Sequence, residues 1–240
     1  MADQAQEFAL PILPLIKDKQ NNNGLKNGNY LRYRTYCTKK LRKLREKLQI
    51  THRETRGKKQ APFFKREITT VKDFFQAQTA NNSEVVIDGR RAVHLVSLVL
   101  FQSERAWSFA MQLKQELAEK GKADSQKRHH YLQRLGKANK WSSKLEELTK
   151  ECFDKRSQLE AEAYHTWMQG NLLLAKEKWR EAQERFIHAR TIYEHLSTVG
   201  RVAQKEVYSQ RVQEIDPSIR FCLYNMGEKK SAASADMLSL

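Results

Sequence analysis

Apolar residues recur at steps of three and four along most of this chain, and no stretch alternates convincingly between apolar and polar residues. A repeat of three and four places side chains on one face of an α-helix, whereas a half-buried strand needs a period of two. The chain also has only nine Gly and four Pro among its 240 residues, which leaves few turns for a sandwich or barrel. The sequence therefore predicts an all-α fold of antiparallel helical hairpins.

The ends of the apolar repeats give the expected helices and domain boundaries. Helices are predicted after Pro14 as far as Asn21–Gly24, and over residues 28–49, 88–120, 124–151, 154–170, 175–196 and 201–215. Asp216-Pro217 is expected to break the chain before a last helix over 218–226, because proline lacks the N–H that a helix interior uses. We expect flexible tails over 1–11 and 229–240, the second being that of a truncated fragment, and one domain over 12–228. Within it, 28–49 is a basic helix and 51–82 a long basic loop, with a short helix around 71–76.

The segment 164–195 has the residue spacing of a tetratricopeptide hairpin. In such hairpins small residues lie where two helices cross closely, and a bulky residue is wedged between them. The matching residues are Gly170, Ala182, Phe186 and Ala189. The usual Trp is displaced by one position, at Trp167, and the closing Pro is absent, so an ordinary amphipathic hairpin remains the alternative. A tetratricopeptide-like array is the predicted architecture.

Positive charge is concentrated in one part of the chain. The formal net charge is +16, from 44 Lys and Arg against 28 Asp and Glu. Residues 26–66 contain 15 Lys or Arg and two acids, a net charge of +13 in 41 residues. Such an excess indicates a polyanionic partner, which is a nucleic acid, an anionic membrane surface or an acidic protein.

The basic helix predicted at 28–49 has an apolar stripe on one side and cations on the other. The stripe consists of Tyr30, Tyr33, Cys37, Leu41, Leu44 and Leu48. Cations on the outer face can neutralise phosphates and release counterions, arginine forks can bind phosphate or guanine, and tyrosines can stack on unpaired bases. The candidate RNA-binding residues of the helix are Arg32, Tyr33, Arg34, Tyr36, Lys39, Lys40, Arg42, Lys43, Arg45 and Lys47. Those of the loop are Arg53, Arg56, Lys58 and Lys59.

The shape of A-form RNA restricts how such a helix can bind. The major groove of an unbroken duplex is deep and narrow, so an α-helix needs a groove opened by a bulge, internal loop or junction. A solvated cationic helix without a ligand is the alternative. A second basic cluster on the helix predicted at 124–151 either extends the same surface or is ordinary helix surface. Its residues are Lys127, Arg128, Arg134, Lys137 and Lys140.

Signals for catalysis, metals and membranes are missing from the sequence. There is no Gly-rich phosphate loop, Walker lysine or HExxH motif, and His188 and His195 have the spacing of a helix face, so we predict neither an enzyme nor a cofactor or metal. The longest apolar run has ten residues, whereas a membrane span needs roughly 20. Cysteines without a CxxC pair are typical of reduced thiols in a cytosolic protein. They are Cys37, Cys152 and Cys222.

Three blocks of residues match the pattern of a known family. The first is Gly24-Leu25 with Gly28, Arg32-Tyr33-Arg34, Tyr36-Cys37, Leu41-Arg42 and Leu44-Arg45. The second is Glu104-Arg105-Ala106-Trp107-Ser108, continuing from Ala110 to Glu116. The third is Ile215 with Pro217, Ile219-Arg220, Cys222, Tyr224-Asn225 and Gly227. Together they resemble the N-terminal RNA-binding domain family of the signal recognition particle 68 kDa subunit. Residues 60–90 are longer than that pattern, which puts any role for Lys65 and Arg66 in doubt.

The resemblance implies a tetratricopeptide-like domain that binds the S domain of the particle's RNA. An arginine-rich helix, here residues 32–47, would enter a widened groove and bend or remodel the RNA, in support of co-translational targeting to the endoplasmic reticulum. The implied partners are this RNA, the 72 kDa subunit through a C-terminal region missing from the fragment, and, indirectly, the particle's receptor. The implied location is cytoplasmic, with a nucleolar assembly stage and association with the endoplasmic reticulum but no membrane insertion.

Two other functions remain open on the residues alone. A tetratricopeptide-type adaptor would bind an acidic protein partner. A peripheral membrane binder would use the helix at 28–49, but its apolar stripe contains Cys37 and tyrosines without Trp or Phe. Such a stripe suits packing on a neighbouring helix better than insertion into lipid.

Overall fold

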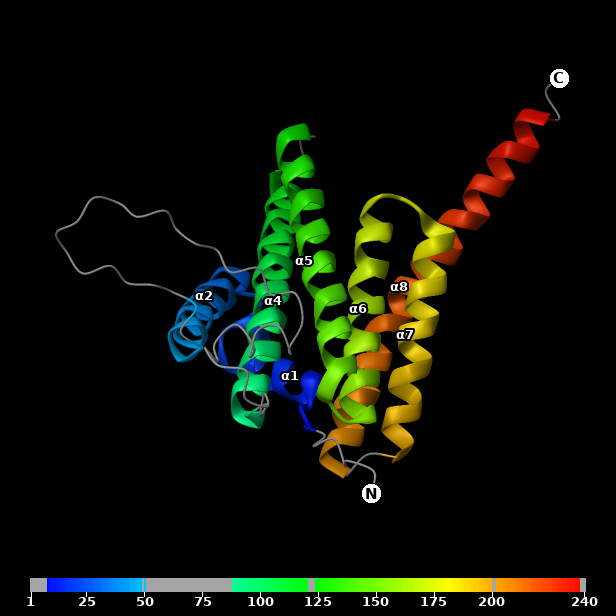
Figure 1. Cartoon of the computed structure of the whole chain (residues 1–240). Coiled ribbons are helices and arrows are strands. Elements are labelled where there is room, and N and C mark those ends of the chain that lie inside the picture. Colours follow the sequence, from blue (N-terminus) through cyan, green and yellow to red (C-terminus); the bar gives the residue numbers. More distant parts are fainter. Residues whose placement is uncertain (1–7, 49, 51–87, 121–123, 200–201, 238–240) are drawn as a thin grey trace.

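The computed structural model describes residues 8–48, 50, 88–120, 124–199 and 202–237, and in this part of the chain the secondary structure is helical apart from one isolated bridge. Figure 1 shows the helices in order. They are α1 (Ile12–Asn22), the short 3-10 helix η1 (Leu25–Asn27), α2 (Tyr30–Lys47), α4 (Gly89–Lys120), α5 (Ser125–Cys152), α6 (Lys155–Ala175), α7 (Trp179–Val199) and α8 (Val202–Met237). The predicted all-α fold is confirmed. The loop expected at 51–82, with its short helix at 71–76, lies outside the described residues.

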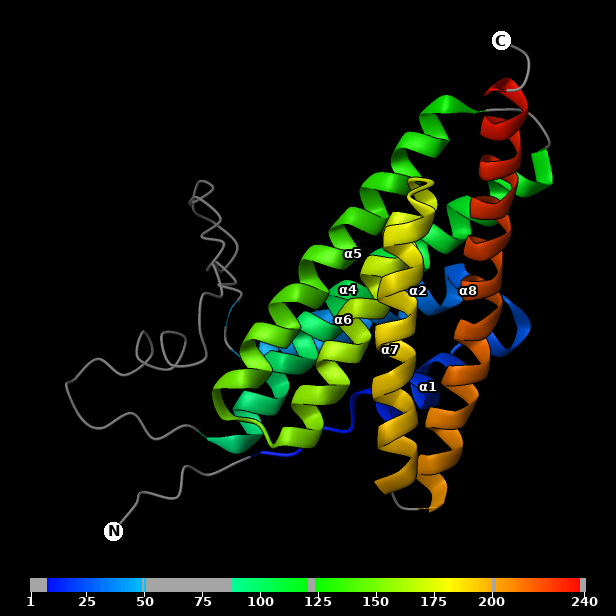
Figure 2. The ribbon, with the colours of Figure 1, turned by 90° about the vertical axis from the view of Figure 1, so that its right-hand side faces the viewer.

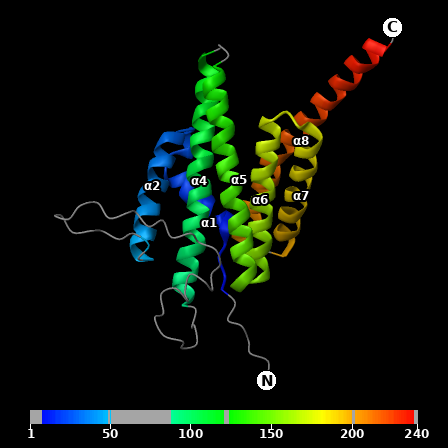
Figure 3. The same cartoon turned by 45° about the horizontal axis from the view of Figure 1, so that its top comes forward.

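The long helices form a series in which each packs on the next. α4 packs on α5, α5 on α6, α6 on α7 and α7 on α8, while α2 lies against α4 at the end of the series away from α7 and α8 (Figures 1 and 3). α1 contacts both α6 and α8. Figure 2 shows α5 and α7 inclined to one another, as in a solenoid of helical hairpins. This arrangement is the tetratricopeptide-like fold that the residue spacing predicted.

The hairpin of α6 and α7 depends on a glycine at its closest approach. Gly170 is buried on α6, and a Cβ at this position would lie 2.8 Å from the Cε1 atom of Phe186 on α7. Ala182 and Ala189 are fully buried on either side of Phe186. The small residues therefore let the two helices pack closely around one ring, which is the reason for the spacing seen in the sequence.

A buried carboxylate on α4 connects four helices. Glu104 is fully buried and accepts hydrogen bonds from the hydroxyl of Tyr33 on α2 (2.7 Å), the amide of Gln20 on α1 (2.9 Å) and the hydroxyl of Tyr164 on α6 (2.7 Å). Burial, followed by the Glu104 charge, raises the pKa of both tyrosines well above its usual value. The hydroxyls therefore stay protonated and remain donors to the carboxylate. This network fixes α2 relative to the hairpin array.

The N-terminal segment is bound to the start of α6, so the predicted flexible tail over 1–11 is wrong for residues 8–11. The Phe8 N–H donates to the Cys152 carbonyl (3.0 Å), and the Asp154 N–H donates to the Phe8 carbonyl (2.9 Å). Ser157 Oγ accepts from the Leu10 N–H at 2.8 Å and donates to the Leu10 carbonyl at 3.1 Å. Sequence reasoning missed this because the segment contributes only backbone N–H and C=O groups to these bonds, which leave no residue pattern in it.

Glu160 on α6 continues the attachment of the N-terminal segment. Its carboxylate accepts from the Leu13 N–H at 2.8 Å and from the Tyr208 hydroxyl of α8 at 2.5 Å. Burial raises the pKa of this carboxyl, while these hydrogen bonds and Arg156 act in the opposite direction. On the solvent side, Lys17 of α1 pairs with Glu214 of α8. The N-terminal segment and the first part of α8 are therefore joined, both through Glu160 of α6 and directly.

The predicted break at Asp216-Pro217 is also wrong, because α8 continues through Pro217 to Met237. The helix is held on both sides of the proline: Ile215 and Cys222 are fully buried in the α7–α8 core, and Asp216 pairs with Arg190 of α7 at 3.3 Å. Pro217 itself is exposed, so the carbonyl that loses its helical partner lies on the solvent side. Packing outweighs the local cost of the proline. Residues 229–237, expected to be a flexible tail, are helical.

Two glycines in helices give a matched test of this packing. Gly170→Ala is expected to lower the free energy of unfolding by about 1–2 kcal/mol, because the new methyl group collides with Phe186 and overpacking outweighs the gain in helix propensity. Gly136→Ala in α5 should instead raise it by about 1 kcal/mol, since a Cβ at this position would have nothing within 4 Å. Urea unfolding measures both values, and stabilisation by Gly170→Ala would contradict the close crossing.

The buried network can be tested with two neighbouring tyrosines. Tyr33→Phe removes one of the donors to Glu104 and should lower the free energy of unfolding by about 1.5–3 kcal/mol. Tyr36→Phe is the control, because the Tyr36 hydroxyl makes no hydrogen bond within the described residues; its effect should stay within about 0.5 kcal/mol. The midpoints of urea unfolding, compared at an unchanged dependence of the unfolding free energy on urea concentration, measure the loss of stability in each variant. Equal effects of the two changes would show that the bond to Glu104 contributes nothing.

Candidate nucleic-acid interface

The start of α2 is set by a tight corner rich in glycine. Gly24 and Gly28 have φ values of 108° and 69°, in the left-handed region that favours glycine. A Cβ at Gly24 would also lie 3.0 Å from Cδ of Arg32. Asn29 caps the helix, since its side chain accepts from the Arg32 N–H at 2.8 Å. These residues fix the direction in which α2 leaves α1.

The inner face of α2 is the predicted apolar stripe, and it is buried. Tyr33, Cys37, Leu41, Leu44 and Leu48 have at most 3% of their surface exposed and belong to the core that includes α4. Burial raises the pKa of the Cys37 thiol. Because this stripe already packs on protein, Leu31 is the one large apolar side chain that the described part of α2 leaves exposed, which is too little for a lipid-binding face. The peripheral membrane hypothesis therefore loses its physical basis.

The outer face of α2 carries exposed cations with little internal compensation. Among the described residues, the only ion pair of this helix joins Arg42 to Glu46 on the next turn (3.1 Å), and both side chains are more than half exposed. Such pairs contribute little to stability. The exposed cations of α2 are Arg32, Lys39, Arg42, Lys43 and Lys47. This face is therefore available to an external anion.

One flank of α2 places cations close together beside α4. The pKa of Lys40 is lowered, first by partial burial and then by the charges of Lys47, Lys19 and Lys43. The pKa of His94 on α4 is lowered by partial burial and then by Lys47 and Lys40. Both shifts are due first to burial and then to neighbouring lysines, so positive charges lie close together along this side of the helix.

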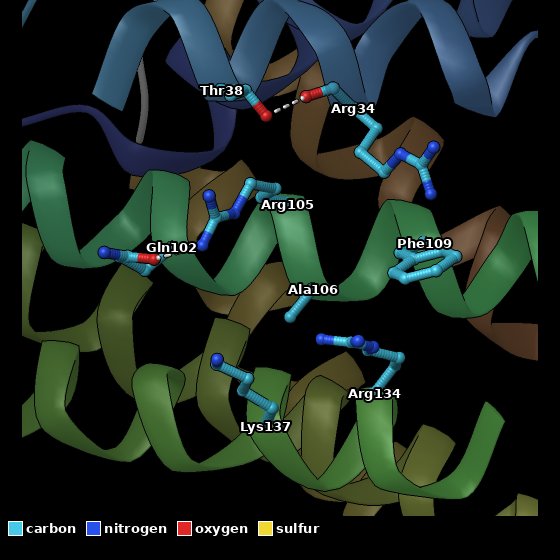
Figure 4. Close-up of a pocket in the computed structure, with 8 residues that line it drawn as sticks. All are labelled: Arg34, Thr38, Gln102, Arg105, Ala106, Phe109, Arg134 and Lys137. Carbon is cyan, nitrogen blue, oxygen red and sulfur yellow. Dashed lines mark hydrogen bonds between the residues drawn. The ribbon is translucent and has the colours of Figure 1, made fainter. Parts of the chain in front are cut away.

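The other flank of α2 forms a groove with α4 and α5, of about 300 Å³. Figure 4 shows its lining. The residues are Arg34 and Thr38 from α2, Gln102, Arg105, Ala106 and Phe109 from α4, and Arg134 and Lys137 from α5. Four of these eight side chains are cationic and none is acidic. The groove is therefore a positively charged hollow directly beside the basic helix.

A phenylalanine ring organises two of the groove's arginines. The guanidinium carbon of Arg34 lies 4.3 Å from the centroid of the Phe109 ring, and that of Arg134 lies 4.7 Å from the same centroid. Arg34 reaches the ring from α2 and Arg134 from α5 (Figure 4). The quadrupole of an aromatic ring attracts cations over its face. Phe109 thus holds together two positive charges that would otherwise repel each other.

Arg105 is a site residue that sequence reasoning missed. Its guanidinium donates to Gln102 Oε1 at 3.1 Å, and its pKa is lowered by burial and then by the charges of Arg45 and Arg134. Its position four residues before Phe109 places both on one face of α4. That spacing was visible in the sequence, but the predicted sites followed runs of cations, and Arg105 lies within a largely apolar helix.

The structure separates the predicted site residues into different groups. Tyr33 has no exposed surface and donates to Glu104, so the prediction that it stacks on RNA bases is wrong. Tyr36 is half-buried and has an edge contact with Phe101, with ring centroids 6.1 Å apart. The loop residues Arg53, Arg56, Lys58 and Lys59 lie outside the described residues.

The second basic cluster is divided along α5. Arg134 and Lys137 line the groove and so extend the surface of α2. Lys127 and Arg128, at the start of α5, instead pair with Glu116 (2.9 Å) and Glu177 (2.5 Å) respectively. Lys140 is exposed one turn beyond Lys137. The groove residues of the cluster therefore extend the surface of α2, whereas Lys127 and Arg128 are ordinary helix surface.

Metal ligands and membrane spans were also sought in the described part of the chain. No three His, Cys, Asp or Glu residues come together there as metal ligands would. None of its helices combines the length and the apolar character needed to cross a bilayer.

Comparison with known families agrees with this geometry. A family model described as RNA-binding signal recognition particle 68 matches residues 25–240. The chain belongs to this family. The signal recognition particle 68 family comprises subunits of a particle and is not a known family of enzymes. The resemblance drawn from the three sequence blocks is confirmed.

Individual relatives support the assignment, and one solved structure shares the fold. The signal recognition particle subunit SRP68 of Drosophila melanogaster is 33% identical over 238 residues, which make up 98% of this chain and 36% of that protein. The subunit of the same name from Dictyostelium discoideum is 35% identical over 235 residues, 95% of this chain and 34% of that protein. The structure of the SRP68-RBD from Chaetomium thermophilum matches 90% of this chain and 97% of its own with a TM-score of 0.67 at 24% identity, and shows the fold. The chain spans about a third of the length of these full-length relatives.

Proposed function

We propose that this domain binds the S domain of the signal recognition particle RNA, with α2 as an arginine-rich helix that enters a widened groove and bends or remodels the RNA. The observation that carries the proposal is the row of exposed cations on a helix whose opposite face is fixed in the core; among the described residues only Arg42 of this row forms an ion pair. Each phosphate that these cations neutralise would release counterions and add affinity without regard to sequence. Family membership supports RNA as the polyanion.

The proposed contact residues follow from their full or partial exposure on α2 and α5. On α2 they are Arg32, Arg34, Tyr36, Lys39, Lys40, Arg42, Lys43, Arg45 and Lys47. Arg134, Lys137 and Lys140 of α5 extend this set, and the loop residues Arg53, Arg56, Lys58 and Lys59 remain part of the proposal. No catalytic step, cofactor or metal is part of the proposed function.

The rigid mounting of α2 supports RNA remodelling over passive binding. Tyr33 and the apolar stripe tie α2 to α4, so the helix cannot easily yield when a groove closes on it. An unbroken A-form duplex is too narrow for a helix in its major groove, so the RNA must open at a bulge or junction. The more rigid partner then determines the shape of the complex.

The wider setting is proposed from family membership alone. The domain would work in co-translational targeting to the endoplasmic reticulum, as part of a cytoplasmic particle with a nucleolar assembly stage. The 72 kDa subunit would bind to a region of the protein outside this chain, and the particle's receptor would be reached indirectly. No insertion into the membrane is proposed.

The proposal predicts which variants lose RNA binding. Replacing Arg42, Lys43 and Arg45 by Ala should weaken binding to S-domain RNA by several kcal/mol, at about 1–3 kcal/mol for each good contact. The fold should be unaffected, because these side chains lie outside the core. The control replaces Lys178, just before α7, together with Arg180 and Arg185 of α7. These exposed cations lie at the opposite end of the helix series (Figure 1), and the control should bind as the wild type does.

Binding is measured by fluorescence anisotropy across a salt series. If about 6–10 phosphates are neutralised, affinity should fall about 10³–10⁵-fold between 50 and 200 mM salt, and the triple variant should show a shallower slope. S-domain RNA should bind well ahead of a plain RNA duplex, an acidic peptide and anionic vesicles. Equal affinity for S-domain RNA and for the plain RNA duplex would show that α2 is only a general cationic surface. Preference for the acidic peptide would favour the adaptor function.

His94 provides a probe of the flank beside Lys40 and Lys47. Phosphates bound near these lysines would offset the charges that now lower the pKa of His94, so this pKa should rise in the complex. A histidine whose pKa is higher in the complex takes up a proton on binding, so affinity should increase as the pH falls through the two values. NMR titration of free and bound protein measures both pKa values.

The control for this titration is His165, which lies 2.9 Å from Ser142 Oγ between α5 and α6. Its pKa, lowered by burial, should stay unchanged on RNA binding. An unchanged or lower His94 pKa in the complex would remove this flank from the interface.

A further inference from the structure

The groove between α2, α4 and α5 differs from the outer face of α2 in being lined by side chains from three helices. Its guanidinium groups come from three helices, Arg34 from α2, Arg105 from α4 and Arg134 from α5, and are seen together in Figure 4. With about 300 Å³, it lies at the small end of the range of ligand sites, about 300–1,000 Å³. Such a volume suits one small group of a larger molecule.

Like charges lie close together among the described residues that line this groove. Arg34 and Arg134 lie within 4.3 and 4.7 Å of one ring centroid, which limits their separation to about 9 Å. Neither forms an ion pair among the described residues, and no Asp or Glu lines the groove. Arg105 is half-buried, and the nearby arginine charges oppose its own. A bound anion would relieve this repulsion.

The donors in the groove are already oriented. Phe109 holds two guanidiniums close to its ring, and Gln102 accepts one N–H of Arg105 and so restrains the third. Each guanidinium has five N–H donors in a rigid fork that matches a phosphate. Since the side chains are held before binding, little rotamer freedom would be lost when an oxyanion arrives.

We propose that this groove is a binding site for a single phosphate group, held by Arg34, Arg105 and Arg134 and organised by Phe109. The source of the phosphate is an internal phosphodiester of RNA. This last assignment rests on the proposed function, whereas affinity for phosphate does not.

The site adds a geometric consequence for RNA on α2. Lys40 and Lys47 lie on the flank near His94, whereas Arg34 and Thr38 lie on the flank that lines the groove. Phosphates on both flanks mean that the RNA backbone runs along both sides of the helix. That is the arrangement of a helix inserted between the two strands of an opened groove, and not of a helix resting on one strand.

The test follows the arginine Nε–Hε signals of the whole chain by NMR, with inorganic phosphate and with the dinucleoside monophosphate UpU as separate probes. The signals of Arg34, Arg105 and Arg134 should shift together and saturate with both probes, while that of Arg185 on α7 should not. Phe109→Leu keeps every charge but removes the ring, and should weaken binding of both probes about tenfold. Arg134→Gln should weaken binding of both probes further without disturbing the core. This variant tests the site if Phe109→Leu does not fold.

Each outcome supports or overturns a separate part of the proposal. Unsaturable shifts, or equal binding by wild type, Phe109→Leu and Arg134→Gln, would overturn the site. Binding of inorganic phosphate but not of UpU would overturn its assignment to an RNA phosphodiester. Saturable binding of both probes would support the site. Normal RNA binding by the outer-face variant of Arg42, Lys43 and Arg45 would contradict only the proposed role of α2 and would leave the phosphate site unaffected.

Discussion

The position of α2 depends on a buried carboxylate that satisfies three donors from three other helices. Glu104 accepts from Gln20, Tyr33 and Tyr164, and all three donors are themselves buried. Removing a carboxylate from water is costly unless such bonds replace its hydration. The network is therefore satisfied only when α1, α2 and α6 are in place around α4 together. It specifies one arrangement of these helices, which apolar packing alone specifies less strictly.

Arg105, the residue that follows Glu104 on α4, faces the surface and not the core. Glu104 points into the core, while Arg105, one position further along the helix, lines the groove beside α2. The helix that fixes α2 from within thus also supplies a cation next to it on the surface. Any shift of α4 relative to α2 would disturb the network and the groove at once. The buried network and the proposed anion site are therefore linked through two adjacent residues.

The parts of this structure that were predictable are those with a local signal. The stripe from Tyr33 to Leu48 predicted the buried face of α2, because a helix repeats its faces within a few residues. The spacing of Gly170 and Phe186 predicted a hairpin for the same reason. Tyr33, which belongs to the stripe, was nevertheless also predicted to contact RNA bases. A tyrosine on an apolar stripe is better expected to be buried with its hydroxyl on a core acceptor.

The parts that failed depend on contacts between distant segments. Pro217 predicts a break by local rules, but Ile215 and Cys222 are buried on the two sides of it, and their packing acts on the whole helix. The attachment of Phe8 to Cys152 and Asp154 uses backbone groups alone. The groove likewise needs cations separated by up to about a hundred positions in the sequence, from Arg34 to Lys137.

The charge pattern explains why the basic segment needs the rest of the fold. An isolated cationic helix of this length is only marginally stable in water. It would therefore lose much conformational entropy when it became ordered on binding RNA. Here the apolar stripe and Tyr33 fix α2 during folding, so its cations are held in place in the free protein. The proposed bending of RNA would need such a rigid helix. Bending costs free energy, which the protein can supply only through contacts that do not relax when the RNA resists.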